Sequence, residues 1–148
     1  MENTKTGCAK TAEKAWSWAR WRGLPVEERW GALGELFGSQ KNASYWGTAV
    51  KWIDEAIRET TELVREEVAS DRKWGSVLDA AHDIATDNKK YWHAWSRMPE
   101  GRKRRELMNL DRFSYDHAAG WIESAMDETA MLLLCAAEMV GVKRERRK

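Results

Sequence analysis

Apolar residues recur every three or four positions along almost the whole chain. Between residues 46 and 68 the apolar positions, which include Val50, Ile53, Ile57 and Val64, fall on one side of a helical wheel, and charged residues fill the other. The sequence has neither alternating β-branched runs nor Asn-Gly or Asp-Gly turns, the patterns that predict strands and hairpins. The pattern therefore predicts an all-α protein, with helices at residues 9–22, 25–37, 43–70, 73–97, 99–110 and 112–141.

Proline and glycine mark the ends of these helices. Pro25 and Pro99 lie where a first helical turn starts, a position at which the missing backbone N–H is not needed. Gly23, Gly38 and Gly141 follow predicted helices, where glycine is common. Both residue types support the predicted boundaries.

Two stretches of the chain spell nearly the same helical phrase, WIDEAIRET from Trp52 and WIESAMDET from Trp121. The similarity extends over both halves and is interrupted by a single five-residue shortening, which is typical of a diverged tandem duplication. A shift of 74 residues aligns Trp18, Trp21, Pro25, Arg29 and Leu33 with Trp92, Trp95, Pro99, Lys103 and Leu107. A shift of 69 residues aligns Trp46, Trp52, Asp54, Glu59 and Leu63 with Tyr115, Trp121, Glu123, Glu128 and Leu132.

Each half is predicted to be a three-helix unit: a helix that carries tryptophan, a short helix after the proline, and a long helix. Repeat 1 covers about residues 9–72 and repeat 2 about 73–142, and a basic tail follows at 143–148. One such unit leaves an apolar face uncovered, so we expect the two units to pack about a pseudo-two-fold axis, as the subunits of an isologous dimer do. The predicted architecture is a single six-helix bundle that forms one domain over residues 1–148.

Composition agrees with a folded, soluble protein. Charged residues make up 33% of the chain and apolar residues 43%. The longest apolar run, Ala130 to Ala137, is far shorter than the ~20 residues of a membrane span, and the N-terminus has no apolar signal-peptide core. Cys8 and Cys135 form neither a disulfide framework nor a metal-binding motif. We expect a cytoplasmic protein.

Ten tryptophans stand out in a chain of this length. Helical spacing favours a structural role in the core, and an aromatic cage or a base-stacking platform is the functional alternative. Glu59 and Glu128 lie on the same helix edges as two of these tryptophans, and we predict that both carboxylates are structural and accept indole N–H groups. The residues predicted to be structural are Trp18, Trp21, Trp52, Glu59, Trp92, Trp95, Trp121 and Glu128.

The acidic residues of the long helices suggest a competing metal site. Asp54, Glu59, Glu123 and Glu128 could gather on facing helices and bind Mg²⁺. The spacings DExxxE and ExxxD resemble the EExxE and ExxD helices of the all-α nucleotide pyrophosphohydrolases. Each is one residue longer, which turns one carboxylate by about 100°. A solvated helix face with i,i+4 ion pairs explains the acids more simply, so we predict neither a metal nor a cofactor.

Candidate catalytic residues are few. Arg112 and His117 have the spacing RxxxxH, which resembles the motif of the helical HEPN ribonucleases, whose dimers place two Arg-His pairs in one cleft. The corresponding first-half positions are Ala43 and Thr48, so the duplicated unit lacks the motif.

Charge is segregated along the chain although its net value is only +1. The long helices are acidic, whereas residues 88–105 carry seven bases and one acid, and the tail KRERRK adds further bases. Tyr91, Trp92 and Trp95 lie among these cations, a combination typical of nucleic-acid binding. The candidate partner-binding residues are Lys89, Lys90, Arg97, Arg102, Lys103, Arg104 and Arg105.

Three functions remain open from the sequence. We predict a non-catalytic helical interaction module, an accessory or inhibitory factor that binds a larger partner with an acidic surface. The alternative is a nucleic-acid-binding protein that uses residues 89–105 and the C-terminal tail. An enzyme, either a HEPN-like ribonuclease or a carboxylate-metal hydrolase, is the third hypothesis.

Overall fold

The computed structural model describes residues 17–38, 44–68 and 73–141, and the basic tail lies outside these ranges. All of the described secondary-structure elements are α-helices, which confirms the predicted all-α class. They are α2 (Trp18–Arg22), α3 (Val26–Gly38), α4 (Tyr45–Glu67), α5 (Trp74–Asp87), α6 (Tyr91–Ser96), α7 (Glu100–Leu110) and α8 (Tyr115–Val140).

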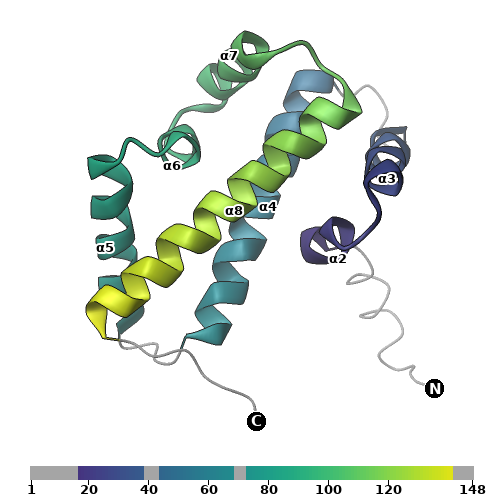
Figure 1. Ribbon diagram of the computed structural model, residues 1–148. Coiled ribbons are helices and arrows are strands. Elements are labelled where there is room, and N and C mark those ends of the chain that lie inside the picture. Colours follow the sequence, from purple (N-terminus) through teal and green to yellow (C-terminus); the bar gives the residue numbers. More distant parts are fainter. Residues whose placement is uncertain (1–16, 39–43, 69–72, 142–148) are drawn as a thin grey trace, which may run out of the picture.

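The two long helices form the centre of the molecule. Helices α4 and α8 lie side by side, with α2 and α3 on one side and α5, α6 and α7 along the other side and the top (Figure 1). Each short helix packs on the long helix of its own half, α2 on α4 and α6 on α8. The next helix crosses to the other half, so that α3 packs on α8 and α7 packs on α4.

Local sequence explains where the helices begin and end. The hydroxyls of Ser17, Ser44 and Ser114 each accept a backbone N–H from the first turn of the helix that follows. Pro99 caps the start of α7, and Pro25 directly precedes α3, each one residue earlier than a first helical position. Gly141 ends α8 with a φ of 88°, a left-handed conformation that favours glycine.

Two predicted helices differ from the structure. The helix expected at 73–97 is divided into α5 and α6, and between them Lys89 has a φ of 53°. Asn88 ends α5, and its side chain donates to the carbonyl of Ile84. Of the helix expected at 9–22, residues 9–16 lie outside the described ranges. In the described part, α2 begins at Trp18, because Ser17 has an extended backbone and is the N-cap residue. The described helices therefore number seven and not six.

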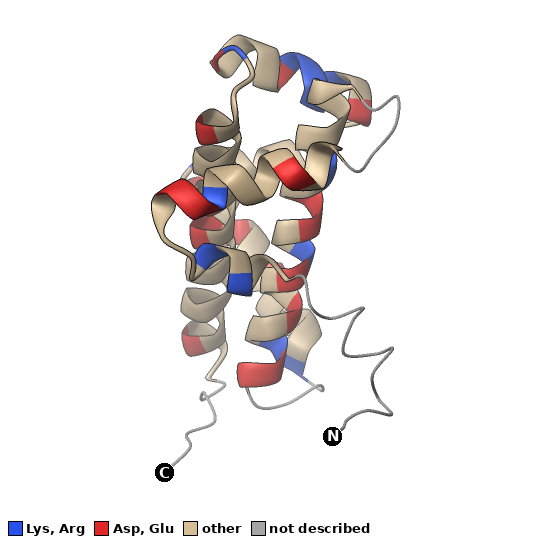
Figure 2. Ribbon diagram, turned by 90° about the vertical axis from the view of Figure 1, so that its right-hand side faces the viewer, with Lys and Arg blue, Asp and Glu red and all other residues tan. Residues whose placement is uncertain are grey.

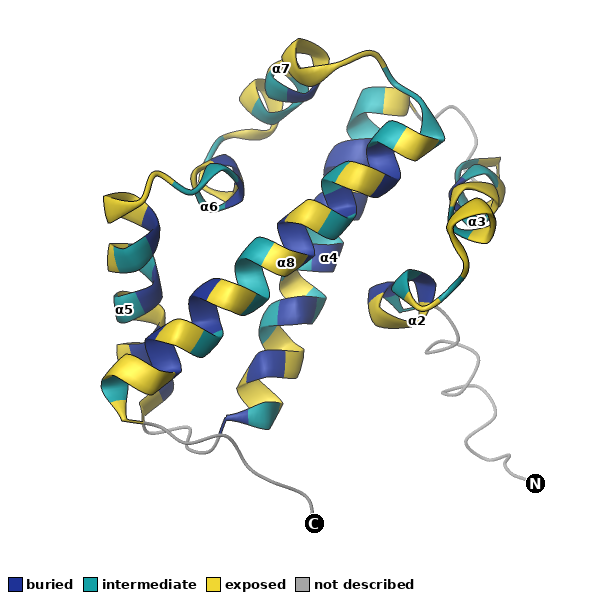
Figure 3. Cartoon of the chain, viewed as in Figure 1, coloured by how far each residue is buried: buried dark blue, intermediate teal, exposed yellow. Residues whose placement is uncertain are grey.

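The core runs along the facing sides of the long helices, where buried positions point inward from the surrounding helices (Figure 3). Its upper part takes residues from both halves, and its lower part joins α5 to the ends of α4 and α8. Five of the six tryptophans predicted to be structural are less than 9% exposed, and Trp121 is half-buried; the five are Trp18, Trp21, Trp52, Trp92 and Trp95. None of the helices in the described ranges is long and apolar enough to cross a membrane.

Candidate functional site

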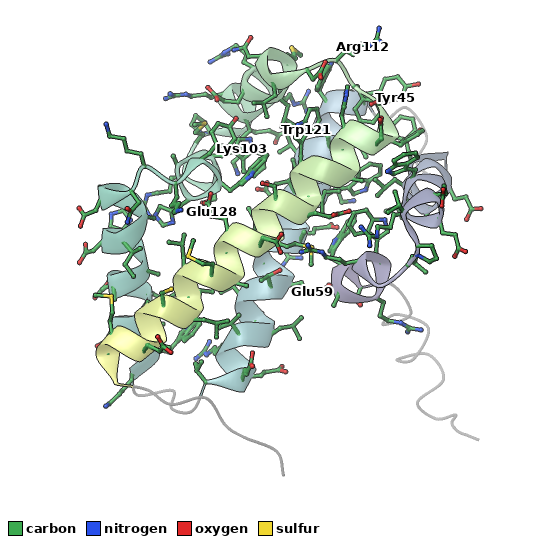
Figure 4. All side chains as sticks on the ribbon, viewed as in Figure 1. Tyr45, Glu59, Lys103, Arg112, Trp121 and Glu128 are labelled. Carbon is green, nitrogen blue, oxygen red and sulfur yellow. The ribbon has the colours of Figure 1, made fainter. Side chains whose placement is uncertain are left out.

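Two glutamates hold the short helices against the long ones. Glu59 of α4 accepts the backbone N–H groups of Trp18 and Ala19, both at 2.8 Å. Glu128 of α8 accepts those of Trp92 and His93, at 3.1 and 2.6 Å (Figure 4). Helices of five and six residues are unstable alone, and a carboxylate at the N-terminus satisfies free donors and complements the helix dipole. Both glutamates thus contact the helices we expected, but through backbone donors.

The indole donors have other acceptors. The Nε1 of Trp21 donates to the carbonyl of Arg29 at 3.1 Å, and the Nε1 of Trp92 donates to the hydroxyl of Ser124 at 2.9 Å. For these two rings, the prediction that a glutamate accepts the indole N–H group is therefore wrong. A carboxylate on a neighbouring helix satisfies two backbone N–H groups at once, which an indole with a single N–H cannot offer.

In the described part of the chain, three ion pairs join the halves. Arg22 of α2 lies 2.5 Å from Asp127 of α8, and the other two connect aligned positions. Arg29 of α3 lies 2.6 Å from Glu123 of α8, and Lys103 of α7 lies 3.0 Å from Asp54 of α4. The aligned bases of the two halves thus reach the aligned acids of the opposite halves. The Lys103 ammonium also lies 4.7 Å from the ring centroid of Trp95, a cation–π distance, and its side chain is only 12% exposed.

The four acids considered for a metal site are therefore dispersed among separate partners. Asp54 and Glu123 bind bases, and Glu59 and Glu128 cap helices. Within the described ranges, no group of three or more His, Cys, Asp or Glu side chains is arranged to hold a metal ion. The geometry offers no support for a carboxylate-metal hydrolase.

The basic segment divides into buried and exposed residues. Lys103 is held inside, and Arg104 bonds Glu100 at 2.7 Å while its guanidinium lies against Gly47, where a Cβ would be 2.8 Å from it. Lys90 is half-buried. The exposed bases of the segment are Lys89, Arg97, Arg102 and Arg105. Basic positions are concentrated on α7, at the top of the molecule in Figure 2.

The aromatic residues of the same segment are not available for stacking on bases. Trp92 is 6% exposed and Trp95 0%. Tyr91 is half-buried, and its hydroxyl donates to Glu106 at 3.1 Å. Burial, together with this bond to Glu106, raises the pKa of Tyr91 to about 12. The combination of exposed cations and exposed rings that suggested nucleic-acid binding is therefore absent from this part of the described chain.

The chain matches no protein-family model, no curated protein and no solved structure.

Arg112 and His117 are brought together, but through the backbone of the arginine. The Nδ1 of His117 lies 2.9 Å from the carbonyl oxygen of Arg112, and its Nε2 lies 3.3 Å from Asp111. The histidine therefore bridges the turn before α8. Both of its ring nitrogens have local partners, and the exposed Arg112 guanidinium is not among them. This arrangement is that of a structural histidine.

A pair of histidines joins α5 to α6. The Nδ1 of His82 lies 2.9 Å from the Nε2 of His93, so one imidazole donates to the other. Burial lowers the pKa of His93 below its usual 6.5, and the neighbouring His82 and Arg97 lower it further. Two ligands alone do not make a typical zinc site.

Sequence reasoning missed the two ion pairs between aligned positions, although a signal was present. In the alignment of the halves, Arg29 corresponds to Lys103 and Asp54 corresponds to Glu123. Each half therefore has a base at the first position and an acid at the second. A base and an acid that both halves share can form an ion pair when the helices that carry them pack together. The spacing alone could not say whether the pairs form within a half or between halves.

Proposed function

We propose that this protein is a non-catalytic helical interaction module that binds a protein partner with an acidic surface through the outer face of α7. This face consists of Arg102, Arg105 and Met108, which lie three residues apart on the helix and are all exposed. Met108 is 49% exposed, whereas the preceding residue, Leu107, is fully buried. Arginine and methionine are both enriched in protein interfaces.

The observation that carries the proposal is that these two arginines have no structural task in the described part of the molecule. In the first half, the positions aligned with Arg102 and Arg105 are Glu28 and Gly31. The bases that both halves share, Arg29 and Lys103, are the ones in the two ion pairs between aligned positions. The exposed charge of α7 is therefore an addition to the common framework, and exposed cations beside an apolar side chain favour an acidic protein surface.

We further propose that the two halves are copies related by a pseudo-two-fold axis. Reciprocal contacts support this: α3 packs on α8 as α7 packs on α4, and Glu59 caps α2 as Glu128 caps α6. The Arg29–Glu123 and Lys103–Asp54 ion pairs follow the same exchange. The third cross-half pair, Arg22–Asp127, has no counterpart, because the aligned residues are Ser96 and Arg58. An isologous arrangement produces such reciprocity, because each contact between matched positions occurs twice.

The proposal is tested by capture with immobilised protein from extracts of the organism that encodes it. The variant Arg102→Ser/Arg105→Ser/Met108→Ser is compared with the wild type and with Arg20→Ser, an exposed arginine on α2. We expect the triple variant to lose a specific protein that Arg20→Ser retains. Truncation of two or three central interface residues commonly reduces affinity by about tenfold or more.

The nucleic-acid alternative is tested by fluorescence anisotropy. Labelled single-stranded and duplex oligonucleotides are titrated with the protein at several salt concentrations. If an oligonucleotide binds at physiological salt and the triple variant loses it, the protein-docking proposal is wrong and nucleic-acid binding replaces it. The proposal also fails if the triple variant captures the same proteins as the wild type.

A further inference from the structure

A groove of about 510 Å³ lies between α6, the end of α7 and the first turns of α8. Its walls include three aromatic side chains, one exposed leucine and two carboxylates: Tyr91, Trp92, Trp121, Leu110, Asp111 and Asp116. It is separate from the outer face of α7 proposed above, and it is open to solvent along one side. Trp121 lies near the upper end of α8 (Figure 4).

The groove occurs where the two halves pack their matched tryptophans differently. In the first half, the rings of Trp18 and Trp52 lie 6.4 Å apart, and Trp52 is only 1% exposed. In the second half, the matched Trp92 and Trp121 both line the groove. Trp121 lies 6.3 Å from the ring of Trp46, and it stays half-buried. The second half thus exposes part of an aromatic surface that the first half buries.

The polar ends of two wall residues are already occupied, and Trp92 is only 6% exposed, so the half-buried Trp121 provides the aromatic surface that a ligand can reach. The indole Nε1 of Trp92 donates to Ser124, and the hydroxyl of Tyr91 donates to Glu106. What remains is aromatic surface beside negative charge. Asp116 accepts the hydroxyl of Ser114, which lowers the pKa of its carboxyl, and it is therefore ionised at neutral pH.

A positively charged organic group matches both features of this groove. The face of an indole attracts a cation, and guanidinium groups also stack flat on aromatic rings. Asp116 and Asp111 supply the opposite charge at the rim, and Asp111 also lies 3.3 Å from the Nε2 of His117, which lines the same groove. A neutral apolar ligand would make no use of the charge of Asp116, and an anion would be repelled by it.

We propose that this groove binds the guanidinium or ammonium group of an organic cation, with Trp121 as the stacking surface and Asp111 and Asp116 as its counter-charges. The group can come from an arginine or lysine side chain of a polypeptide or from a free amine. Either source presents the same chemistry to the groove.

The test is isothermal titration of the full-length protein with three probes. They are a blocked tripeptide with arginine at its centre, the same tripeptide with citrulline, and agmatine as a free guanidinium compound. Citrulline is nearly isosteric with arginine but neutral, so we expect it to bind at least about tenfold more weakly than the arginine peptide. Tighter binding of agmatine than of the arginine peptide identifies a free amine as the ligand, and the reverse identifies a side chain.

Two variants separate the contributions of the rings and the charges. Trp121→Leu is expected to weaken binding of the arginine peptide about tenfold, and Asp111→Asn/Asp116→Asn about threefold to tenfold. Trp30→Leu, which alters a tryptophan 39% exposed on α3 outside the groove, is the matched control and should bind like the wild type. Thermal melts identify any variant that fails to fold, and the double Asn variant keeps every ring in place.

Three results overturn the proposal. The arginine and citrulline peptides could bind equally, which removes the role of charge. The Trp30→Leu control could lose as much affinity as Trp121→Leu, which removes the role of the groove. No heat of binding from either guanidinium probe up to the solubility limit rejects the site altogether.

Discussion

Trp18 and Trp21 of α2 meet edge to face with ring centroids 5.5 Å apart and planes at 75°, and Trp92 and Trp95 of α6 meet at 5.6 Å and 70°. The outer helices of the two halves show no such agreement. In α3 the first turn is acidic, with Glu27 and Glu28, whereas α7 exposes Arg102 and Arg105.

The difference indicates which positions packing constrains. A tryptophan in a close-packed interior has few tolerated replacements, which accounts for its presence at the aligned positions of both halves. An exposed residue on the outer face contacts solvent, and a substitution there typically changes stability by only about ±0.5 kcal/mol. The charge of an outer helix can therefore differ between the halves while the fold is retained, and the outer face of α7 is where we propose that a partner binds.

The largest expected effect is a difference in the stability lost when Trp52 or the aligned Trp121 is replaced. Because Trp52 is 1% exposed and Trp121 is half-buried, replacing Trp52 by Ala should cost ~3–5 kcal/mol, and replacing Trp121 by Ala less than about half of that. Urea denaturation followed by circular dichroism measures both. The indole Nε1 of Trp52 has no hydrogen-bond partner in the described ranges, so Trp52→Phe should lose packing alone and remain folded.

Equal losses at the two positions would contradict this contrast. They would mean that Trp121 is packed as tightly as Trp52, and the groove beside it would then be closed in solution. The Trp30→Ala variant on the exposed face of α3 is the reference for a tryptophan whose removal leaves little cavity.

Much of the interior was predictable from the sequence for a simple reason. Helical periodicity indicates which face of a helix is buried, and the similarity of the halves indicates which positions both halves share. Five of the tryptophans named from these two signals are buried. Neither signal reports the direction of a side chain across a helix interface. Glu59 was therefore placed beside the right helix, but its backbone donors on Trp18 and Ala19 were not foreseen.

The break between α5 and α6 was missed because local and periodic signals conflict there. The apolar spacing continues past Asn88, but asparagine competes for backbone hydrogen bonds and is common at helix ends. The candidate site was predictable only in part. The basic cluster is visible in the sequence, but its division into exposed Arg102 and buried Lys103 depends on which side of α7 meets Asp54.

A smaller effect should distinguish the two capping glutamates. Both accept two backbone N–H groups, but the N–H of Ala19 at Glu59 is exposed, whereas both donors at Glu128 are partly buried. Water can replace the carboxylate more easily at Ala19, so Glu59→Ala should cost ~1 kcal/mol and Glu128→Ala ~2 kcal/mol. The Gln variants keep one acceptor and should lose about half as much. Urea denaturation that ranks Glu59→Ala above Glu128→Ala would show that exposure does not set these energies.

The smallest expected effect concerns pH and is confined to the second half, where His93 lies against His82. Burial and these neighbours lower the pKa of His93 below 6.5 in the folded protein, so the folded state binds fewer protons than the unfolded chain just below that pH. The contribution of His93 to the free energy of unfolding is therefore complete above about pH 6.5 and declines as the pH falls toward its folded pKa. Urea denaturation between about pH 5 and 7.5 should show a shallower decline in His93→Gln than in the wild type. His82→Gln should give an intermediate decline, because it removes the neighbouring charge and leaves the burial. An unchanged slope in His93→Gln would mean that the 2.9 Å contact between the two imidazoles has no influence on stability in this range.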